Sequence, residues 1–409
     1  MLRSTGWSYV SRLAVKRADN SSRQGTTLPV AGLSGLTVSP FPSQIIGDYR
    51  ILSRSVAASL VSQYRERIPH LRICSISEDS DRCAREDSLY CYSNNIKTGC
   101  GYAQLEMNFY AKSCPKAENI IKDFVQKQVP KAPNTAAAIL RMHFHDCFVR
   151  GCDGSVLLNF TSSTGNQTEK QANPNLTLRG FSFIDAVKRL VEAECPGVVS
   201  CADIIALVAR DAVVVTGGPF WNVPTGRRDG TISNVSEANA DIPAPTSNFT
   251  RLQQSFAKKG LDLKDLVLLS GAHTIGVSHC SSFSERLYNF TGVFGTQDPS
   301  LDSEYADNLK SRKCKSINDN TTIVEMDPGS FKTFDLSYFK LLLKRRGLFQ
   351  SDAALTTRTT TKTFIEQLVD GPLKEFFDEF AKSMEKMGRV EVKTGSAGEI
   401  RKHCAFVNN

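Results

Sequence analysis

The sequence predicts a mainly α-helical protein with very little β-structure. From about residue 104 onward, apolar residues recur every three or four positions, the period of a helix with one buried face. Breaks such as Pro196-Gly197 and Gly371-Pro372 divide this region into segments of helical length. Few segments alternate between apolar and polar residues, as a half-buried strand would. These three observations favour helix packed on helix.

The first predicted helix covers residues 114–129, where apolar side chains follow an amphipathic period and Pro130 ends the segment. The second begins near Asn134, a residue type that caps helix N-termini, and carries Arg141 and His145. Later segments lack such clear ends, but the same period and the glycine and proline breaks define them. The further predicted helices are residues 181–194, 200–215, 249–259, 263–273, 279–288, 334–345 and 361–387.

Two other stretches are predicted to be irregular. The segment DIPAPTSNF, which contains Pro243, reads as a loop because of its prolines. Residues 289 to about 320 are polar and are expected to be mobile. The helix of residues 361–387 should bend or break at Gly371-Pro372, because proline cannot continue a helix without a kink.

The run RMHFHDCFVRGCDGS, residues 141–155, holds the densest group of reactive side chains. Arg141 and His145 are four residues apart, so a helix presents them on one face. A permanently charged guanidinium beside an imidazole suits proton transfer next to developing negative charge. The pair is therefore a candidate catalytic site, although such a pair is also common on solvated helix faces.

Oxygen-bearing side chains follow this pair directly. Asp146, Asp153 and Ser155, interleaved with Gly151, form a turn of the kind that binds calcium. Cys147 and Cys152 bracket the turn and could close it with a disulfide. A zinc site is the competing hypothesis, since His143, His145 and Cys147 are all zinc ligand types. It fits poorly because these side chains point to different faces of a helix, and His143 reads as structural.

The motifs TEK, PNLTLRGF, VSCADI, GRRDG, DIPAP, DLVLLSGAHTIG and IRKHCAFVNN follow this run in order. Together they resemble the class III plant secretory peroxidases over about residues 104–409. The resemblance implies the plant-type haem peroxidase fold, with haem b between two helical halves. It also implies reduction of hydrogen peroxide to water, coupled to oxidation of small phenolic donors in two one-electron steps. In that family the reaction serves peroxide removal, responses to oxidative stress and phenol oxidation in the cell wall, including lignin formation.

The resemblance also implies roles for particular residues. On one side of the haem, His145 would act as the acid/base group, Arg141 would stabilise negative charge, and Asn175 would accept the proton of His145. Phe144 would shield the iron from organic donors. On the other side, His273 would be the axial iron ligand, and Asp352 would accept its second imidazole proton. Donors would be oriented by the backbone at Pro243.

Two calcium ions are implied as well. The ligands of the distal ion would be Asp146, Asp153 and Ser155 with the carbonyl groups of Val149 and Gly151, while Glu169 would link this ion to Asn175. The proximal ion would be bound by residues adjoining the axial histidine and by a later acidic loop: Thr274, Asp327, Ser330, Asp335 and the carbonyl group of Thr333.

The cysteine content points to an oxidising compartment. The chain has 12 cysteines, and the region from Cys114 onward holds an even number without CxxC pairs, which reads as a disulfide framework. The sequence alone cannot choose among the pairings. The resemblance implies Cys114 with Cys195, Cys147 with Cys152, Cys201 with Cys404, and Cys280 with Cys314. N-x-S/T acceptor sites agree with secretion to the cell wall or vacuole and occur at Asn159, Asn166, Asn175, Asn234, Asn248, Asn289 and Asn320. Asn175 is better explained by its implied role beside His145.

Residues 1–103 lie outside the resemblance and are predicted to form a largely disordered arm. They lack a sustained helical or strand period, and the start shows no clear signal peptide. A weak transit peptide and a wrongly assigned coding start are both compatible with their composition. The cysteines of this arm fit no familiar metal-binding spacing: Cys74, Cys83, Cys91 and Cys100.

Composition sets further limits. Fifty basic and 42 acidic residues give a formal charge of +8 without a basic run interleaved with aromatics, so nucleic-acid binding is not expected. No apolar stretch reaches the length of about 18 residues needed to span a membrane.

The expected protein is a monomer. Besides an active peroxidase, the sequence leaves open a catalytically silent haem- or calcium-binding wall protein and a zinc hydrolase; the silent protein is disfavoured because Arg141, His145 and His273 are all present.

Overall fold

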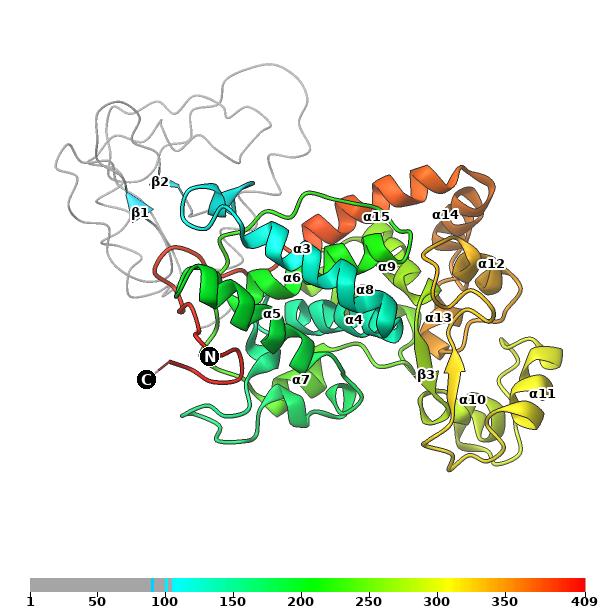
Figure 1. Cartoon of the computed structure of the whole chain (residues 1–409). Coiled ribbons are helices and arrows are strands. Elements are labelled where there is room, and N and C mark those ends of the chain that lie inside the picture. The colour runs from blue at the N-terminus through cyan, green and yellow to red at the C-terminus, as the bar shows by residue number, and fades with distance from the viewer. Residues whose placement is uncertain (1–89, 92–99, 102–104, 409) are drawn as a thin grey trace, which may run out of the picture. The chain divides into compact units, whose positions relative to one another are not determined.

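The computed structural model describes residues 90–91, 100–101 and 105–408 (Figure 1). Two-residue strands, β1 (Tyr90–Cys91) and β2 (Cys100–Gly101), pair antiparallel. The rest of the predicted N-terminal arm, including Cys74 and Cys83, lies outside the described residues. Helices dominate residues 105–408, so the predicted fold class is confirmed.

The helices of the first half of this region are α3 (Ala117–Gln128), α4 (Asn134–Phe148), α5 (Phe181–Glu194), α6 (Cys201–Val215) and α7 (Val235–Asp241). Those of the second half are α8 (Phe249–Lys258), α9 (Leu263–Ser270), α10 (Ser284–Tyr288), α11 (Ser303–Arg312), α12 (Ser337–Leu343), α13 (Gln350–Ala354), α14 (Thr359–Asp370) and α15 (Leu373–Met387). One further antiparallel pair joins β3 (Val277–His279) and β4 (Ile323–Glu325).

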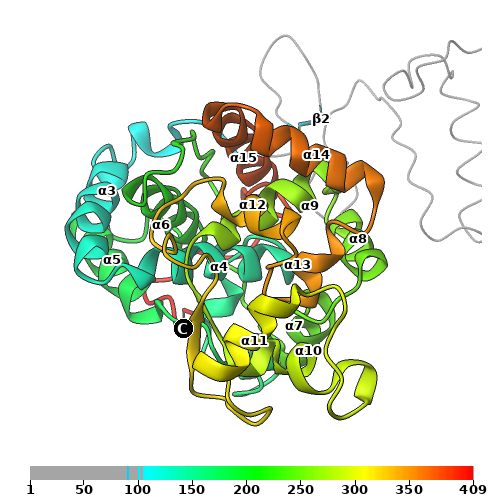
Figure 2. The same cartoon turned by 90° about the vertical axis from the view of Figure 1, so that its right-hand side faces the viewer.

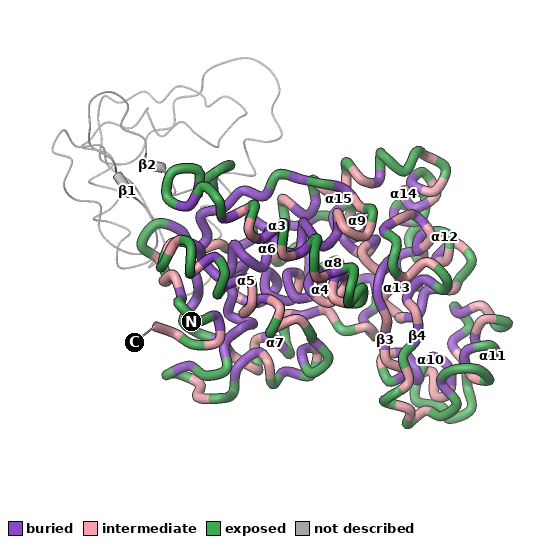
Figure 3. Tube along the Cα trace, viewed as in Figure 1, coloured by how far each residue is buried: buried purple, intermediate pink, exposed green. Residues whose placement is uncertain are grey.

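Helix α4 lies near the centre of the molecule. Figure 2 shows α3, α5 and α6 on one side of it and α8, α9, α12 and α13 on the other. Helix α6 packs against both α4 and α3 and is buried from Cys201 to Val213, as the tube of Figure 3 shows. The side chain of Ser200 caps α6 by accepting a hydrogen bond of 3.1 Å from the backbone N–H of Asp203. This buried pair of helices gives the catalytic candidates on α4 a rigid support.

The second half is built around α9, which packs against α8 and α15. A capping box formed by Asp262 and Asp265 starts α9 at a defined residue. The helix ends at Ser270, and His273 lies in the following 3₁₀ turn, Gly271–Thr274. That turn contacts α12. The predicted helix of residues 263–273 was therefore too long at its end.

A smaller core lies beside these two halves. It contains Phe283, Leu287 and Leu309, and the disulfide between Cys280 and Cys314 closes it. Helices α10 and α11, strand β4 and the segments beside them supply its residues. The stretch that was expected to be mobile thus contains α11, and the predicted helix of residues 279–288 is reduced to α10 preceded by strand and 3₁₀ turn.

Other predicted boundaries need smaller corrections. Asn134 is the first residue of α4 and not its cap, because Pro133 holds the cap position without a side-chain hydrogen bond. The predicted helix of residues 334–345 is shortened to α12. The break at Gly371-Pro372 is confirmed, since it separates α14 from α15. Helices α7 and α13 were not predicted; each is short and follows or precedes a proline- or glycine-containing loop.

The four disulfides connect the cysteines that the resemblance implies. Their S–S distances lie between 1.97 and 2.07 Å. One joins the start of α6 to the C-terminal segment through Cys201 and Cys404. Another closes the turn after α4 through Cys147 and Cys152. In the described part of the chain, no helix is both long and apolar enough to cross a membrane.

Candidate active site

One face of α4 is only partly buried although the helix lies in the core. Between Ala136 and Val149, the partly exposed side chains are Ala137, Ala138, Arg141 and Phe144, and the rest are buried. Their spacing of three to four residues places them on a single stripe. The stripe carries the predicted Arg141 and ends beside His145. Neighbouring side chains therefore do not fully cover this line of residues on α4.

Two acceptors hold the guanidinium of Arg141 at this stripe. Nη2 donates to the carbonyl oxygen of Pro174 at 2.6 Å, and Nη1 donates to the hydroxyl of Thr177 at 3.0 Å. Burial and the neighbouring charge of Arg179 lower the pKa of Arg141 to about 10, so it remains charged at neutral pH. Both acceptors lie in the PNLTLRGF motif, which explains why that motif accompanies Arg141.

The same motif holds His145. Nδ1 of His145 lies 2.5 Å from Oδ1 of Asn175, and Nδ2 of Asn175 donates to the carbonyl oxygen of Glu169 at 2.8 Å. The second bond fixes the orientation of the amide, so its oxygen accepts the Nδ1–H of His145. Burial and the charge of Arg141 hold the pKa of His145 well below its ordinary value, against the opposing effect of Asn175. His145 is thus neutral near pH 7, with Nε2 as a proton acceptor.

His273 is held in the same way, but by a carboxylate. Its Nδ1 donates to Oδ1 of Asp352 at 2.9 Å. The hydroxyl of Tyr338 donates to the same oxygen at 2.9 Å, and the backbone N–H of Phe349 donates to Oδ2 at 2.8 Å. Burial, followed by the charge of Asp352, raises the pKa of Tyr338 well above its ordinary value, so the phenol stays protonated. Since Nδ1 is occupied, Nε2 is the nitrogen of His273 that can coordinate a metal.

The segments carrying the two histidines approach each other closely. A Cβ atom at Gly276, three residues after His273, would lie 2.7 Å from the Cβ atom of Ala137 on the partly exposed stripe of α4. Edges of Tyr338 and Phe349 flank the imidazole of His273 at ring-centroid distances of 5.5 and 5.4 Å. A flat apolar cofactor with a central metal fits this arrangement: one imidazole is free at Nε2, the stripe is partly exposed, and aromatic rings surround the site.

Buried oxygens without partners occur at the end of α4, in the turn that follows it and in the 3₁₀ turn Glu169–Gln171. Among the described residues, Oδ1 of Asp146, Oγ of Ser155 and both carboxylate oxygens of Glu169 have no hydrogen-bond partner. Burial and the charge of Asp153 raise the pKa of Asp146 to about 8, and burial raises that of Glu169 well above its ordinary value. Buried acids of this kind need a cation, so the donor set fits calcium.

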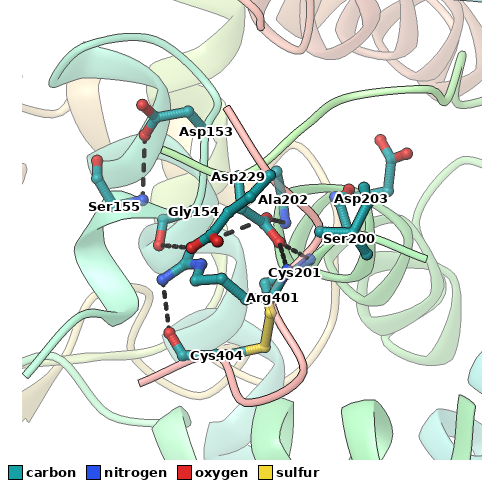
Figure 4. A network of polar contacts seen from close by, with 12 residues as sticks. Asp153, Gly154, Ser155, Ser200, Cys201, Ala202, Asp203, Asp229, Arg401 and Cys404 are labelled. Atoms are coloured by element: carbon teal, nitrogen blue, oxygen red, sulfur yellow. Dashed lines mark hydrogen bonds and ion pairs between the residues drawn. A yellow bond between two sulfur atoms is a disulfide. The ribbon is translucent and has the colours of Figure 1, made fainter. Parts of the chain in front are cut away.

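A buried polar network anchors this turn to the C-terminal segment (Figure 4). Arg401 donates 2.6 Å hydrogen bonds to the carbonyl oxygens of Gly154 and Cys404. Asp229 accepts hydrogen bonds from the backbone N–H groups of Cys201, Ala202 and Arg401 at 2.9 to 3.1 Å. The turn also receives Lys393, whose Nζ donates to Asp153 at 2.8 Å. The last residues of the chain therefore fix the turn in place.

The second predicted calcium group lies next to His273. The hydroxyl of Thr274 lies 3.4 Å from Oδ2 of Asp327 and 3.2 Å from Oδ1 of Asp335, and Ser330 donates to Asp335 at 2.9 Å. Burial and the charge of Asp335 raise the pKa of Asp327 to about 6. Thr333 joins the same loop through its backbone N–H, which donates to the carbonyl oxygen of Ser330. These oxygens also suit calcium.

The zinc hypothesis finds no support at α4. Cys147 forms a disulfide with Cys152, so it has no thiolate to offer. His143 is buried, with Nδ1 3.6 Å from the sulfur of Cys147. Among the described residues, no group of three or more His, Cys, Asp or Glu side chains is arranged to hold a metal. Both candidate calcium groups instead combine carboxylates with hydroxyl groups.

Comparison with known proteins gives one consistent family. A family model described as Peroxidase matches residues 121–371. The chain is 70% identical over 307 residues to Peroxidase 3 of Arabidopsis thaliana, which covers 75% of this chain and 93% of that protein. It belongs to the class III plant peroxidases. Peroxidase 30 of Arabidopsis thaliana is 67% identical, over 75% of this chain and 92% of that protein. Peroxidase 1 of Oryza sativa subsp. japonica is 58% identical, over 75% of this chain and 94% of that protein.

As a peroxidase, the protein is an oxidoreductase that uses haem, hydrogen peroxide and an electron donor. The site contains several contributors that the sequence did not reveal. Thr177 and the carbonyl group of Pro174 hold Arg141, and Tyr338 shares Asp352 with His273. Arg401 was missed as well, because it adjoins Lys402 and His403 in a polar stretch whose sequence gives no sign that it is buried. Tyr338 gave no signal either, because an aromatic residue in a helical segment usually belongs to the core.

Proposed function

We propose that this peroxidase reduces hydrogen peroxide with His145 and Arg141 and binds haem through His273. The observation that carries the proposal is the contrast between the two histidine contacts. Nδ1 of His145 meets a neutral amide at 2.5 Å, whereas Nδ1 of His273 meets a carboxylate at 2.9 Å. An amide leaves the first imidazole neutral and ready to accept a proton, while a carboxylate makes the second a stronger electron donor.

The protein side chains then divide the proton chemistry. Bound haem supplies the iron that binds peroxide and exchanges electrons with it. Nε2 of His145 takes a proton from hydrogen peroxide and returns it to the oxygen that leaves as water. The guanidinium of Arg141 stabilises negative charge on the departing oxygen. Phe144, which packs 4.2 Å from Phe148 between ring centroids, keeps larger molecules away from this position.

We infer that small phenols are the electron donors of this site. Pro243 is partly exposed, directly after α7, and its backbone is the proposed contact for the donor. Two successive donors each supply one electron. Peroxide removal under oxidative stress and phenol oxidation in the cell wall, including lignin formation, are uses of such a reaction.

Two calcium ions complete the proposed protein. The distal ion would be held by Asp146, Asp153, Ser155 and the carbonyl groups of Val149 and Gly151, with Glu169 nearby. The proximal ion would be held by Thr274, Asp327, Ser330, Asp335 and the carbonyl group of Thr333. The four disulfides support secretion, and we propose a monomer whose peroxidase domain spans residues 104–409.

The deciding experiment is an absorption spectrum of the full chain produced through a secretory route, before and after one equivalent of hydrogen peroxide. We expect a Soret band that shifts with peroxide and returns on addition of a phenol such as guaiacol. Arg141→Leu should retain the band but slow the shift by about 10²-fold or more, as for loss of a charge-stabilising group. Absence of the band in correctly oxidised protein supplied with haem would contradict the role of His273, and unchanged kinetics in Arg141→Leu would contradict that of Arg141.

A further inference from the structure

A single carboxylate oxygen receives two side-chain donors beneath the proposed iron ligand. Oδ1 of Asp352 lies 2.9 Å from Nδ1 of His273 and 2.9 Å from the hydroxyl of Tyr338. Asp352 and Tyr338 are each only 1% exposed. An ionised carboxylate can only accept, so the phenol must donate to it. His273 therefore competes with Tyr338 for the same oxygen.

This competition affects the iron through His273. The more strongly Asp352 attracts the Nδ1 proton, the more negative charge the imidazole carries and the more electron density it donates to a metal at Nε2. A second donor on Oδ1 draws part of the carboxylate charge away and weakens that attraction. We infer that Tyr338 is a positioning residue that limits the electron donation of His273 and so sets the reduction potential of the haem. The inference rests on the proposed role of His273.

The surroundings make the phenol well suited to this task. The ring of Tyr338 meets His273 edge to face, with centroids 5.5 Å apart and an interplanar angle of 89°. It also packs against Phe339 at 5.3 Å. The ring is thus held by apolar contacts that do not depend on its hydroxyl. The other carboxylate oxygen is fixed by the backbone N–H of Phe349, so removal of the hydroxyl changes one hydrogen bond and leaves the carboxylate in position.

The test compares Tyr338→Phe with wild type in the haem-loaded full chain, using two measurements that do not depend on turnover. Resonance Raman spectra of the ferrous protein report the stretching frequency of the bond between iron and histidine, and spectroelectrochemistry reports the potential of the ferric/ferrous couple. We expect the frequency to rise and the potential to become more negative, because Asp352 then attracts the His273 proton without competition. Asp352→Asn should shift both quantities in the opposite direction.

The chain offers a matched control. The hydroxyl of Tyr110 also donates to a buried carboxylate, Oδ2 of Asp203 at 2.6 Å, and neither residue forms a hydrogen bond with His273 or Asp352. Tyr110→Phe removes the same kind of hydrogen bond and should leave both quantities unchanged. In the Asp352→Asn background, Tyr338→Phe should have little further effect, because the charged acceptor through which it acts is gone.

The outcomes separate the inference from the proposal beneath it. A wild-type ferrous protein without an iron–histidine band would contradict the role of His273 itself. A normal band with no shift in Tyr338→Phe, or an equal shift in the Asp352→Asn background, would overturn the inference alone. Should Tyr338→Phe fail to fold, fluorotyrosine at position 338 provides the complementary test. It keeps the ring and makes the phenol a stronger donor, so the frequency should fall; a rise or no change would overturn the inference.

Discussion

The two sides of the active site use the same kind of contact for opposite purposes. Each presents a histidine whose Nδ1 is held by a side-chain oxygen, at 2.5 Å from Asn175 and at 2.9 Å from Asp352. We call the part of the site that carries His145 the α4 side and the part that carries His273, in the turn after α9, the α9 side. The acceptor on the α4 side is neutral, and the acceptor on the α9 side is charged. Under the proposed function, this difference in charge would suit the imidazole of His145 to proton transfer and that of His273 to metal binding.

The surroundings of the two histidines reinforce this difference. Burial lowers the pKa of His145, and the neighbouring charge of Arg141 lowers it further because it opposes a second positive charge. His273 is surrounded by the edges of Tyr338 and Phe349, and its carboxylate partner is buried. Each histidine is followed in the chain by a residue of a candidate calcium group, Asp146 or Thr274. The comparison therefore predicts that perturbations of the two sides have separable signatures.

Removing the proposed base should give the largest effect. In His145→Leu, hydrogen peroxide loses its proton acceptor, so its reaction with the ferric protein should slow by about 10²- to 10⁴-fold. The Soret band and the iron–histidine frequency should stay as in wild type, because the α9 side is unchanged. Stopped-flow absorption after mixing with peroxide measures the rate. A rate within the wild-type range would show that another group moves the proton.

Replacing the neutral amide of Asn175 by a carboxylate should make the environment of His145 resemble that of His273. Asn175→Asp places a carboxylate at Nδ1 of His145, which favours the protonated imidazole and raises its pKa. His145 then becomes protonated at a higher pH, so the acidic limb of the pH–rate profile should shift to higher pH. At neutral pH the peroxide reaction should be slow, and at alkaline pH it should recover.

The neighbouring exposed asparagine gives a control for this change. Asn173→Asp adds the same charge two residues away without touching His145, and should leave the profile in place. An Asn175→Asp protein with an unmoved acid side would mean that the protonation of His145 does not govern the reaction.

Much of this comparison could be predicted from the sequence, because short motifs carry it. Arg141 and His145 share a helix face by spacing alone, and the ordered motifs then implied Asn175, His273 and Asp352. The structure brings each of these into the predicted contact. Motifs succeed here because each site residue is fixed by its own local segment and by one partner from another motif.

Features that depend on distant segments were missed. Helix α11 has few apolar residues, and it is stabilised by burial of Ala306 and Leu309 in the smaller core. The 3₁₀ turn at His273 follows a helix whose apolar residues continue to Leu269, next to its last residue. Tyr338 reaches Asp352 only because α12 packs on that turn. Such contacts are set by tertiary packing, which overrides the local period of the sequence.

Loss of calcium ligands should have a moderate effect that differs between the two sides. Asp146→Ala should lower thermal stability and remove the part of its calcium dependence that comes from the distal ion, which is worth about 2.7 kcal/mol when calcium is a hundred times its Kd. It should slow the peroxide reaction while leaving the iron–histidine band unchanged. Asp327→Ala should instead alter that band, because Thr274 adjoins His273.

Calorimetry with and without chelator, together with Raman spectra, would measure both variants. Equal melting temperatures of the wild-type protein with and without chelator would contradict calcium binding. Identical spectral changes in the two variants would contradict the separation of the two sides.

The smallest expected effect concerns the support of the distal turn by Arg150. This residue adopts a left-handed backbone conformation, φ 60°, between the proposed carbonyl ligands Val149 and Gly151. Its guanidinium forms two hydrogen bonds with Glu237 on α7, at 2.6 and 2.8 Å. The pair is partly exposed, so it should contribute only about 0.2–1 kcal/mol, whereas the backbone conformation costs a non-glycine residue about 1–2 kcal/mol.

Substitutions at Arg150 separate these two contributions. Arg150→Ala loses the pair and keeps the unfavourable backbone conformation, while Arg150→Gly loses the pair and relieves the conformation. The glycine variant should therefore unfold at a higher denaturant concentration than the alanine variant, and Glu237→Gln should show the loss of the pair alone. None of the three should move the iron–histidine band, since Arg150 supports only the α4 side. An alanine variant as stable as the glycine variant would mean that the turn relaxes to another conformation once the pair is removed.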